Sequence, residues 1–280
     1  MQWRGRGESS NVEDRRGMGG GRMGLPLGGG IGGIVLLLVL SALTGTNPLE
    51  LIGGVSGPAE EVGSGAPPAN DPQSQFIRVV LGDTEETFSR VFSERGANYE
   101  EPTLVLFTDA TQSACGVGQS AMGPFYCPVD RKVYLDLSFF QELDQRFGAP
   151  GDFAQAYVVA HEVGHHIQTL TGLSQRVSAA RQQGGEAEAN ALSVRQELQA
   201  DCYAGVWGNY AAQKGLLDPG DVEEGLRAAA AIGDDRLQRQ TQGRIVPESF
   251  THGSSEQRVS WLKRGLESGR LESCDTFATR

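Results

Sequence analysis

The sequence predicts a mainly helical α+β fold with a small sheet near its N-terminal end, preceded by one transmembrane helix. Three observations support this prediction. Residues 24–45 carry no charge, short apolar runs at 103–107 and 132–135 are bounded by turn residues, and the second half repeats apolar residues at helical spacing. A chain of 280 residues is long enough to bury one sizeable core besides these additions.

The charge of the chain is unevenly placed. Five arginines within residues 1–24 face three acidic residues, a local charge of +2, whereas the whole chain carries −11. The remainder therefore carries −13, which argues against nucleic acid as a main partner, since phosphate binding needs concentrated Lys and Arg. The Gly- and Arg-rich residues 1–24 are predicted to form a disordered cytoplasmic tail.

Residues 25–45 are predicted to form a transmembrane helix. Ile31–Leu43 is almost continuously aliphatic, and a span of about 20 uncharged residues crosses a hydrocarbon core of about 30 Å. Arginines before the segment and acidic residues after it favour a cytoplasmic N-terminus and a single-pass protein of the cell membrane. The alternative is a cleaved signal peptide, because the apolar part is short and Ser41–Thr46 are small. Both interpretations place most of the chain outside the cytoplasm.

Residues 46–72 are rich in Gly, Pro, Ala and Glu, a composition that predicts a flexible linker. The folded domain is then expected over residues 73–275. Its four cysteines are an even number in a chain predicted to be exported, which favours two disulfides. Of the three possible pairings, proximity favours Cys115–Cys127 with Cys202–Cys274. Buried free thiols are the alternative, and zinc binding by cysteine is not expected because there is no CxxC pair.

Within the domain, apolar spacing predicts a series of helices and two strands. Asp152 is expected to cap the helix that ends near Leu170. Gly123–Pro128 is expected to be a turn. The expected strands are 103–107 and 132–135, and the expected helices are 73–95, 138–147, 152–170, 186–214, 219–237 and 254–268.

The segment VVAHEVGHHIQ (158–168) lies within one of these helices. His161 and His165 are four residues apart, so both imidazoles project from one face and can bind one Zn²⁺. Glu162 lies beside the open coordination position, where it can accept a proton from water and return it to the leaving amine. This is the HExxH pattern of zinc peptidases.

The alternative for this segment is a surface helix that carries histidines by chance. Three of the four histidines of the chain occur in this one stretch, and its flanks are apolar as in a core helix. Gly164 is expected to open space beside the metal. These features favour the zinc site.

A catalytic zinc site needs three protein ligands and one open position. Glu197, in RQELQADCYAGVW (195–207), is the candidate third ligand, and one zinc ion per chain is expected. Asp201 lies four residues later and is expected to bind the free N–H of a histidine ligand. The alternative, a helix surface with scattered acids, fits poorly with the apolar residues around them.

Two histidines remain. His166 points about 100° away from His165 on the helix, so a packed or surface role is expected. His252 precedes a helix with a capping-box pair, Ser254 and Gln257; it either stabilises the oxyanion of the reaction or only caps and packs. Lys132–Leu135 is the candidate edge strand for pairing with an extended peptide, or an ordinary sheet strand.

The motifs GPFYCPVDRKVYLD, AHEVGHHIQ, ELQADCYAGVW and THGSSEQR occur in this order over about residues 70–275. In this combination the chain resembles the neutral zinc metallopeptidase family of bacteria, and its Gly-rich N-terminus with one apolar segment is similar too. The resemblance implies a zincin-like domain with the metal and base roles given above for His161, Glu162, His165 and Glu197. The arrangement of Glu197 followed by Asp201 is similar to that of gluzincin-type peptidases, where glutamate is the third ligand. The THGSSEQR segment resembles the late His motif of membrane-linked peptidases of that clan, which implies a role for His252.

The sequence therefore predicts a zinc metalloendopeptidase that hydrolyses peptide or protein substrates outside the cytoplasm. Two alternatives belong to other classes: a non-catalytic, metal-stabilised scaffold of the envelope, and an amidase that acts on cell-wall peptides. Neither the substrate nor the oligomeric state follows from the sequence.

Overall fold

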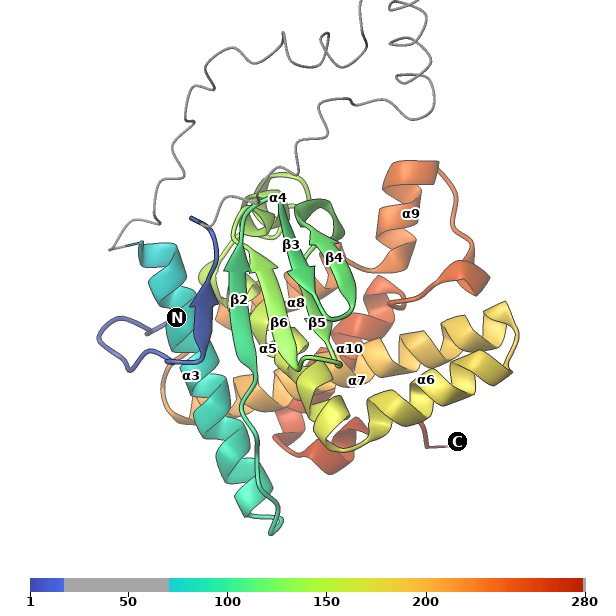
Figure 1. Cartoon of the computed structure of the whole chain (residues 1–280). Coiled ribbons are helices and arrows are strands. Elements are labelled where there is room, and N and C mark those ends of the chain that lie inside the picture. Colours follow the sequence, from blue (N-terminus) through green and yellow to red (C-terminus); the bar gives the residue numbers. More distant parts are fainter. Residues whose placement is uncertain (18–70, 279–280) are drawn as a thin grey trace, which may run out of the picture. The chain divides into compact units, whose positions relative to one another are not determined.

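The long helix α3 precedes a group of short strands, and further helices follow, which is the order that the apolar pattern predicts for residues 73–275 (Figure 1). The computed structural model describes residues 1–17 and 71–278. The strands are β1 (Val12–Asp14), β2 (Thr103–Phe107), β3 (Ala110–Ser113), β4 (Gly116–Gln119), β5 (Phe125–Cys127) and β6 (Lys132–Asp136). The helices are α3 (Pro72–Ser93), α4 (Phe139–Gln145), α5 (Asp152–Leu170), α6 (Leu173–Gln183), α7 (Glu186–Gln213), α8 (Asp221–Ala231), α9 (Asp234–Gln242) and α10 (Ser255–Ser268).

The main sheet has the strand order β1-β2-β6-β5, and β3 and β4 form a separate hairpin. Strands β1, β2 and β6 run parallel, and β5 is antiparallel to β6. Because side chains alternate along a strand, β2 serves two faces. Leu104 and Leu106 enter the main core, whereas Val105 and Phe107 pack with Tyr134 in a smaller cluster on the other face.

The edge strand of this sheet is not the one that the sequence suggests. The expected strand at Lys132–Leu135 exists as β6, but it is bonded on both sides, to β2 and to β5. Its backbone groups are therefore used within the sheet. Among the described residues the sheet ends at β1 on one side and at β5 on the other, and β5 lies in the segment Gly123–Pro128 for which the sequence predicts only a turn.

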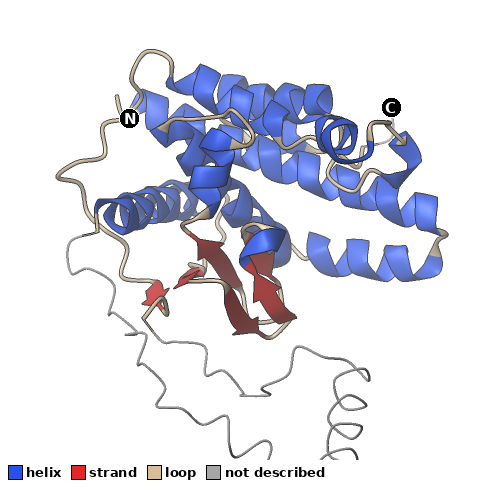
Figure 2. Cartoon of the chain, turned by 90° about the horizontal axis from the view of Figure 1, so that it is seen from above, coloured by secondary structure: helices blue, strands red, loops and turns tan. Residues whose placement is uncertain are grey.

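Most of the helices form a layer on one side of the sheet (Figure 2), and α5 contacts both the sheet strands β5 and β6 and the helices α7 and α8. Close packing of these helices depends on glycine. A Cβ at Gly164 of α5 would lie 2.9 Å from the carbonyl oxygen of Ala200 in α7, and a Cβ at Gly265 of α10 would lie 2.0 Å from that of Cys202. Gly164 therefore lets α5 and α7 approach each other, rather than only opening space for a metal as the sequence suggests.

The helix expected at 219–237 is in fact two helices, α8 and α9, separated near Gly233. A Cβ at Gly233 would lie 2.4 Å from the backbone nitrogen of Ser255, so the chain turns where it meets the start of α10. Helix α5 begins at Asp152 with Gly151, not Asp152, as its N-cap. The capping box of Ser254 and Gln257 is present at α10 as predicted.

The described residues 1–17 are ordered, so the prediction of a disordered tail is wrong for them. Strand β1 pairs with β2, and the Trp3 ring packs edge-on against Phe76 at 5.4 Å between centroids. Arg6 forms an ion pair of 3.1 Å with Asp83. Polar composition alone misled the prediction, because the tail contributes a strand to an existing sheet and needs no core of its own.

The predicted transmembrane helix at 25–45 lies outside the described residues, as does the predicted linker up to residue 70. Among the helices formed by residues 1–17 and 71–278, none combines the length and apolarity that a membrane crossing requires.

Both expected disulfides, Cys115–Cys127 and Cys202–Cys274, are formed. The first ties the β3–β4 hairpin to β5, and the second ties α7 to the C-terminal segment. They close segments with sequence separations of 12 and 72 residues.

We expect removal of Cys202–Cys274 by a double Cys→Ala change to lower the free energy of unfolding by about 4 kcal/mol, against about 3 kcal/mol for Cys115–Cys127. The longer closed loop restricts the unfolded chain more. Urea unfolding of both double variants checks the order, and equal losses would contradict it.

Candidate metal centre

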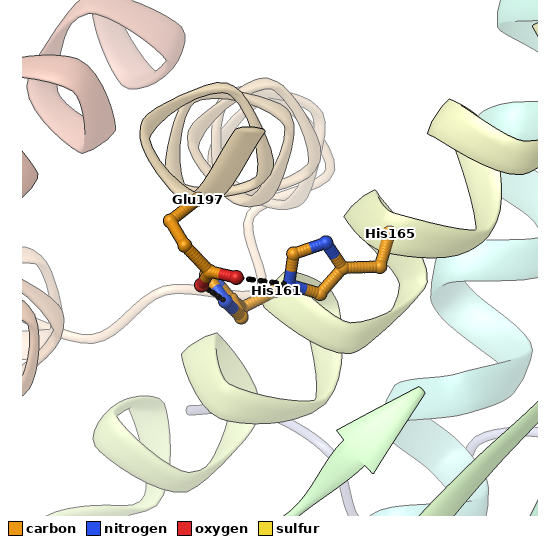
Figure 3. A group of neighbouring side chains, drawn as sticks. All are labelled: His161, His165 and Glu197. Carbon is orange, nitrogen blue, oxygen red and sulfur yellow. Dashed lines mark hydrogen bonds and ion pairs between the residues drawn. The ribbon is translucent and has the colours of Figure 1, made fainter. Parts of the chain in front are cut away.

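His161 and His165 lie one turn apart on α5 and face Glu197 on α7 (Figure 3). His161 Nε2 lies 3.2 Å from Glu197 Oε2, and His165 Nε2 lies 3.4 Å from Glu197 Oε1. One ligand atom from each residue falls within a group whose members are all within 4.8 Å of one another. The structure thus brings together the three residues named as ligands from the sequence.

The second nitrogen of each imidazole is held by another side chain. His161 Nδ1 lies 2.8 Å from Asp201 Oδ1, and His165 Nδ1 lies 2.9 Å from Gln168 Oε1. Both acceptors require a proton on Nδ1, so in the neutral form of each imidazole the lone pair lies on Nε2, the nitrogen that faces Glu197. Asp201 thus lies where the sequence places it, whereas the role of Gln168 was not expected.

These distances fit zinc. Ligand atoms about 2.0–2.1 Å from a tetrahedral zinc ion lie about 3.3–3.4 Å from each other. The two Nε2–carboxylate distances, 3.2 and 3.4 Å, have this size already. Two imidazoles and one carboxylate are also the donor set of a well-known class of catalytic zinc sites.

The group leaves room for a fourth partner. Among the described residues, the group contains His161, His165 and Glu197 and no other His, Cys, Asp or Glu. A structural zinc site normally has four protein ligands, whereas a catalytic site keeps one position open. The arrangement therefore has the form of a catalytic site.

The metal centre opens onto a cleft of about 610 Å³. Glu162 lies in its wall next to His161 and is buried, and this burial raises the pKa of its carboxyl group. Strand β5 contributes Phe125 and Tyr126 to the same wall. Further apolar side chains line the cleft: Met122, Pro124, Pro128, Phe139, Phe147, Val158, Ile232 and Leu237.

Asp201 is fully buried and bound on every side. Oδ1 accepts hydrogen bonds from Tyr157 Oη at 2.6 Å and from Arg258 Nη2 at 2.9 Å, and Oδ2 accepts one from Arg258 Nε at 2.9 Å. Burial opposes ionisation, but the charges of Arg258 and His161 lower the pKa of Asp201 to about 2. A buried carboxylate of this kind orients His161 firmly.

His252 lies at the cleft, held by Asp234 at the start of α9. Its Nδ1 is 3.1 Å from Asp234 Oδ1, and Asp234 Oδ2 accepts the backbone N–H groups of Thr251, His252 and Gly253. The side chain of His252 is exposed, and the hydrogen bond to Asp234 raises its pKa. His252 thus lines the cleft without joining the metal-ligand group.

His166 is a packed residue, as expected from its direction on α5. It is fully buried, with Nε2 2.6 Å from the carbonyl oxygen of Glu100 and Nδ1 3.0 Å from Tyr126 Oη. Nε2 therefore donates, and Nδ1 accepts from the tyrosine. His166 connects α5 to the edge strand β5.

A second carboxylate group, Asp152, Asp221 and Glu224, also lies close together. The amino group of Met1 is 2.9 Å from Asp152 and 3.2 Å from Asp221, so a cation already balances this group. It has no neutral ligand and does not resemble the histidine-containing centre.

Without metal, the centre holds protons. Burial opposes charge on His161, but Asp201 and Glu197 raise its pKa to about 10. Burial likewise disfavours the carboxylate of Glu197, but His165 and His161 hold its pKa well below the usual value. The zinc-binding form of an imidazole ligand is neutral.

We therefore expect zinc binding at pH 7 to release at least one proton per ion, because His161 is protonated beforehand. Calorimetric titration in buffers of different ionisation enthalpy measures this number. Proton-free binding at pH 7 would contradict the charge state described here.

Three partners of the site were missed from sequence. Gln168 follows His165 by three residues on the same helix, so helical spacing could have indicated it. Arg258 ends the THGSSEQR motif, but nothing in the motif shows that it reaches Asp201. Asp234 lies 18 residues before His252 and carries no sequence signal.

The comparisons with known proteins agree with this geometry. A family model described as "Putative neutral zinc metallopeptidase" matches residues 1–277. An Escherichia coli K12 protein, "Uncharacterized protein YpfJ", is 51% identical over 284 residues, covering 99% of each chain. "Uncharacterized protein Rv2575" of Mycobacterium tuberculosis H37Rv is 43% identical over 216 residues, covering 73% of this chain and 72% of that protein. No solved structure matches the chain significantly.

Proposed function

We propose that this chain, which belongs to the neutral zinc metallopeptidase family, is a zinc-dependent endopeptidase that hydrolyses peptide bonds. The observation that carries the proposal is the convergence of His161, His165 and Glu197 beside an open cleft, with Glu162 in the cleft wall. Two histidines, a carboxylate and a free position fit a catalytic zinc ion better than a structural one.

His161, His165 and Glu197 would hold zinc. When bound there, zinc supplies Lewis-acid chemistry, which polarises the carbonyl of the scissile peptide and increases the acidity of water. Glu162 then acts as the general base: its carboxylate accepts a proton from the attacking water and delivers it to the leaving amine nitrogen. Its raised pKa suits the first of these steps, because a carboxylate with a higher pKa is a stronger base toward the attacking water.

His252 is placed to stabilise the negative oxygen that forms when water adds to the carbonyl. In the charged imidazole Nδ1–H donates to Asp234, a hydrogen bond that raises the pKa of His252, and Nε2–H remains as a second donor. This favours the oxyanion role over a purely capping role, since the helix cap is supplied by Ser254.

The edge strand β5 is the proposed binding strand for the substrate. On the described part of the chain it is bonded only to β6, and its own residues Phe125 and Tyr126 line the cleft. An extended peptide can add to such an edge through main-chain hydrogen bonds, with side chains alternating between two faces. The strand that we propose to pair with the substrate is therefore Phe125–Cys127, in place of the candidate Lys132–Leu135 from the sequence.

A digest of a peptide library by the purified full chain tests the proposal. We expect cleavage that a chelator abolishes and zinc restores, at internal peptide bonds. Wall-fragment substrates run in parallel test the amidase alternative, and cleavage of wall peptides alone would favour it. Absence of hydrolysis on all substrates by a zinc-loaded protein would favour the scaffold.

We further propose that the catalytic domain works outside the cytoplasm. The two disulfides support this, since disulfides persist mainly in oxidising compartments. The apolar segment within residues 25–45 remains the predicted membrane contact.

Replacement of His252 by Ala is expected to lower kcat about 10²-fold or more with little change in KM, because the donor acts on charge that develops only in the transition state. The hydrogen bond to Asp234 raises the pKa of His252 above 6.5, so wild-type activity should fall as pH rises through that pKa. His252→Gln keeps a donor that does not titrate and should lose this alkaline limb. An unchanged pH–rate profile in His252→Gln would remove His252 from the mechanism.

A further inference from the structure

Arg258 on α10 is a buried cation that contacts the metal centre only through Asp201. Its exposure is 2%, and its guanidinium forms two nearly parallel hydrogen bonds to Asp201, each 2.9 Å long. Nη2 also donates to Tyr157 Oη at 3.1 Å, and Nη1 donates to the carbonyl oxygen of Ile232 at 3.2 Å. One side chain thus joins α5, α7, α8 and α10.

The two bonds from Arg258 fix the plane of the Asp201 carboxylate. A carboxylate held by one bond can rotate about its terminal torsion, whereas a guanidinium fork defines both oxygens. With the plane fixed, Oδ1 faces His161 Nδ1 at 2.8 Å. Among residues 1–17 and 71–278, Arg258 also supplies the only full positive charge that contacts Asp201 once His161 is a neutral zinc ligand.

We propose that Arg258 is a positioning residue of the metal centre, which sets zinc affinity by locking Asp201 and, through it, the ring of His161. This rests on the proposed zinc site but not on peptidase activity. Arg258 is therefore more than a tie between helices, and lysine, which lacks the planar fork, should not replace it.

The test measures zinc affinity by competition with a chelator, and the unfolding free energy of the metal-free protein, in the full chain. Arg258→Lys is expected to fold and to bind zinc about 10–100-fold more weakly, the usual effect of losing a partner behind a ligand. Arg264→Lys, on the exposed side of α10, is the matched control and should bind as wild type.

A double variant separates positioning from stability. Arg258→Met leaves Asp201 as an unpaired buried charge and should destabilise the fold, whereas Arg258→Met with Asp201→Asn removes both charges and should recover stability. The double variant should still bind zinc weakly. Wild-type zinc affinity in Arg258→Lys, or recovery of zinc affinity together with stability in the double variant, would reduce Arg258 to a structural role. If no variant bound zinc at all, including Arg264→Lys and wild type, the proposed function itself would fail.

A second, independent observation concerns the N-terminal segment, residues 1–15. Its backbone joins the sheet: β1 pairs with β2 from Val12 to Asp14, and the N–H of Arg15 donates to Leu106 at 2.8 Å. Its side chains join α3, where Ser9 Oγ donates to Glu85 at 2.8 Å. A Cβ at Gly82 of α3 would lie 3.2 Å from the Ser9 backbone nitrogen, so helix and segment are in close contact.

Residues on opposite sides of a bilayer cannot form these contacts, because about 30 Å of hydrocarbon would separate them. We infer that residues 1–15 lie on the same side of the membrane as the metal centre. A cytoplasmic N-terminus with an external catalytic domain, as the sequence predicts, is then incompatible with the folded molecule. Cleavage of a signal peptide, the alternative from the sequence, would remove β1 and its pairing with β2.

Thiol chemistry on the full chain in oriented membrane vesicles tests this inference, because the native cysteines are paired. Glu8→Cys reports on the N-terminal segment and Lys263→Cys, on the exposed side of α10, reports on the domain. Both should react with a membrane-impermeant maleimide in vesicles of the same orientation. Reaction in opposite orientations would overturn the inference.

A cross-link adds a direct readout. The side chains of Glu8 and Gln75 are hydrogen-bonded at 2.9 Å, so a short bifunctional maleimide should join Glu8→Cys to Gln75→Cys within one chain. The pair Glu8→Cys with Lys263→Cys is the control. If the first pair does not cross-link more than the control, the N-terminal segment does not contact α3 in the membrane-bound protein.

Discussion

Replacement of Glu162 by Gln is expected to reduce peptide hydrolysis by about 10²–10⁴-fold while zinc stays bound. Glutamine has the shape of glutamate but cannot accept a proton from water, so only the proton transfer is lost. Glu162 is not one of the three candidate ligands, so the metal centre should remain intact. Steady-state kinetics and metal analysis of the same preparation measure both effects.

The matched control for this change is Glu267→Gln on the exposed side of α10, which should act as wild type. If both variants have the same free energy of unfolding, the lower activity of Glu162→Gln comes from the lost proton transfer and not from a less stable fold. Full activity of Glu162→Gln would remove Glu162 from the mechanism, and loss of zinc together with activity would place it among the metal ligands.

Replacement of Glu197 by Ala is expected to weaken zinc binding by more than about 100-fold and to abolish detectable turnover. The change removes one of three ligands, which should exceed the 10–100-fold loss typical of a partner that only supports a ligand. It also leaves His161 and His165 without the carboxylate that they face at 3.2 and 3.4 Å. Competition with a chelator of known affinity gives the dissociation constant.

Glu186→Ala, an exposed acid in the first turn of the same helix α7, is the control for that measurement. Glu186→Ala changes the net charge by the same amount as Glu197→Ala, but Glu186 lies at the start of the helix and outside the metal-ligand group. If Glu197→Ala bound zinc as tightly as this control, the third ligand would have to be another residue.

Much of the helical architecture follows from local patterns. The helices that carry the site, α5 and α7, begin and end near glycine and contain long stretches without proline, so their existence was predictable. The sheet was less so. Strand β5 has only three residues, follows Gly123 and Pro124, and ends at Cys127. Its position at an edge depends on which strands pair, which is a long-range property.

The N-terminal segment shows the same limit from another side. Residues 12–14 form a strand only because β2 offers them a free edge more than 85 residues later in the chain. No local composition indicates such a partner, and charged, Gly-rich segments normally remain disordered. The prediction of a tail was therefore reasonable from composition but wrong for the described residues.

At the site, what could be predicted is what a helix repeats. Spacings of four residues placed His161 with His165, and Glu197 with Asp201, each pair on one face. The contact between the two helices was assumed from zinc chemistry, and the structure places it at Gly164 and Ala200. Arg258 and Asp234 reach the site from other helices, and their roles need the fold.

The most direct test of this account is a crystal structure of the zinc-loaded protein with anomalous diffraction at the zinc edge. We expect one zinc ion per chain, about 2.0–2.2 Å from His161 Nε2, His165 Nε2 and a carboxylate oxygen of Glu197, with solvent in the remaining position. An anomalous peak elsewhere, or a fourth protein ligand that closes the site, would contradict a catalytic zinc centre at these residues.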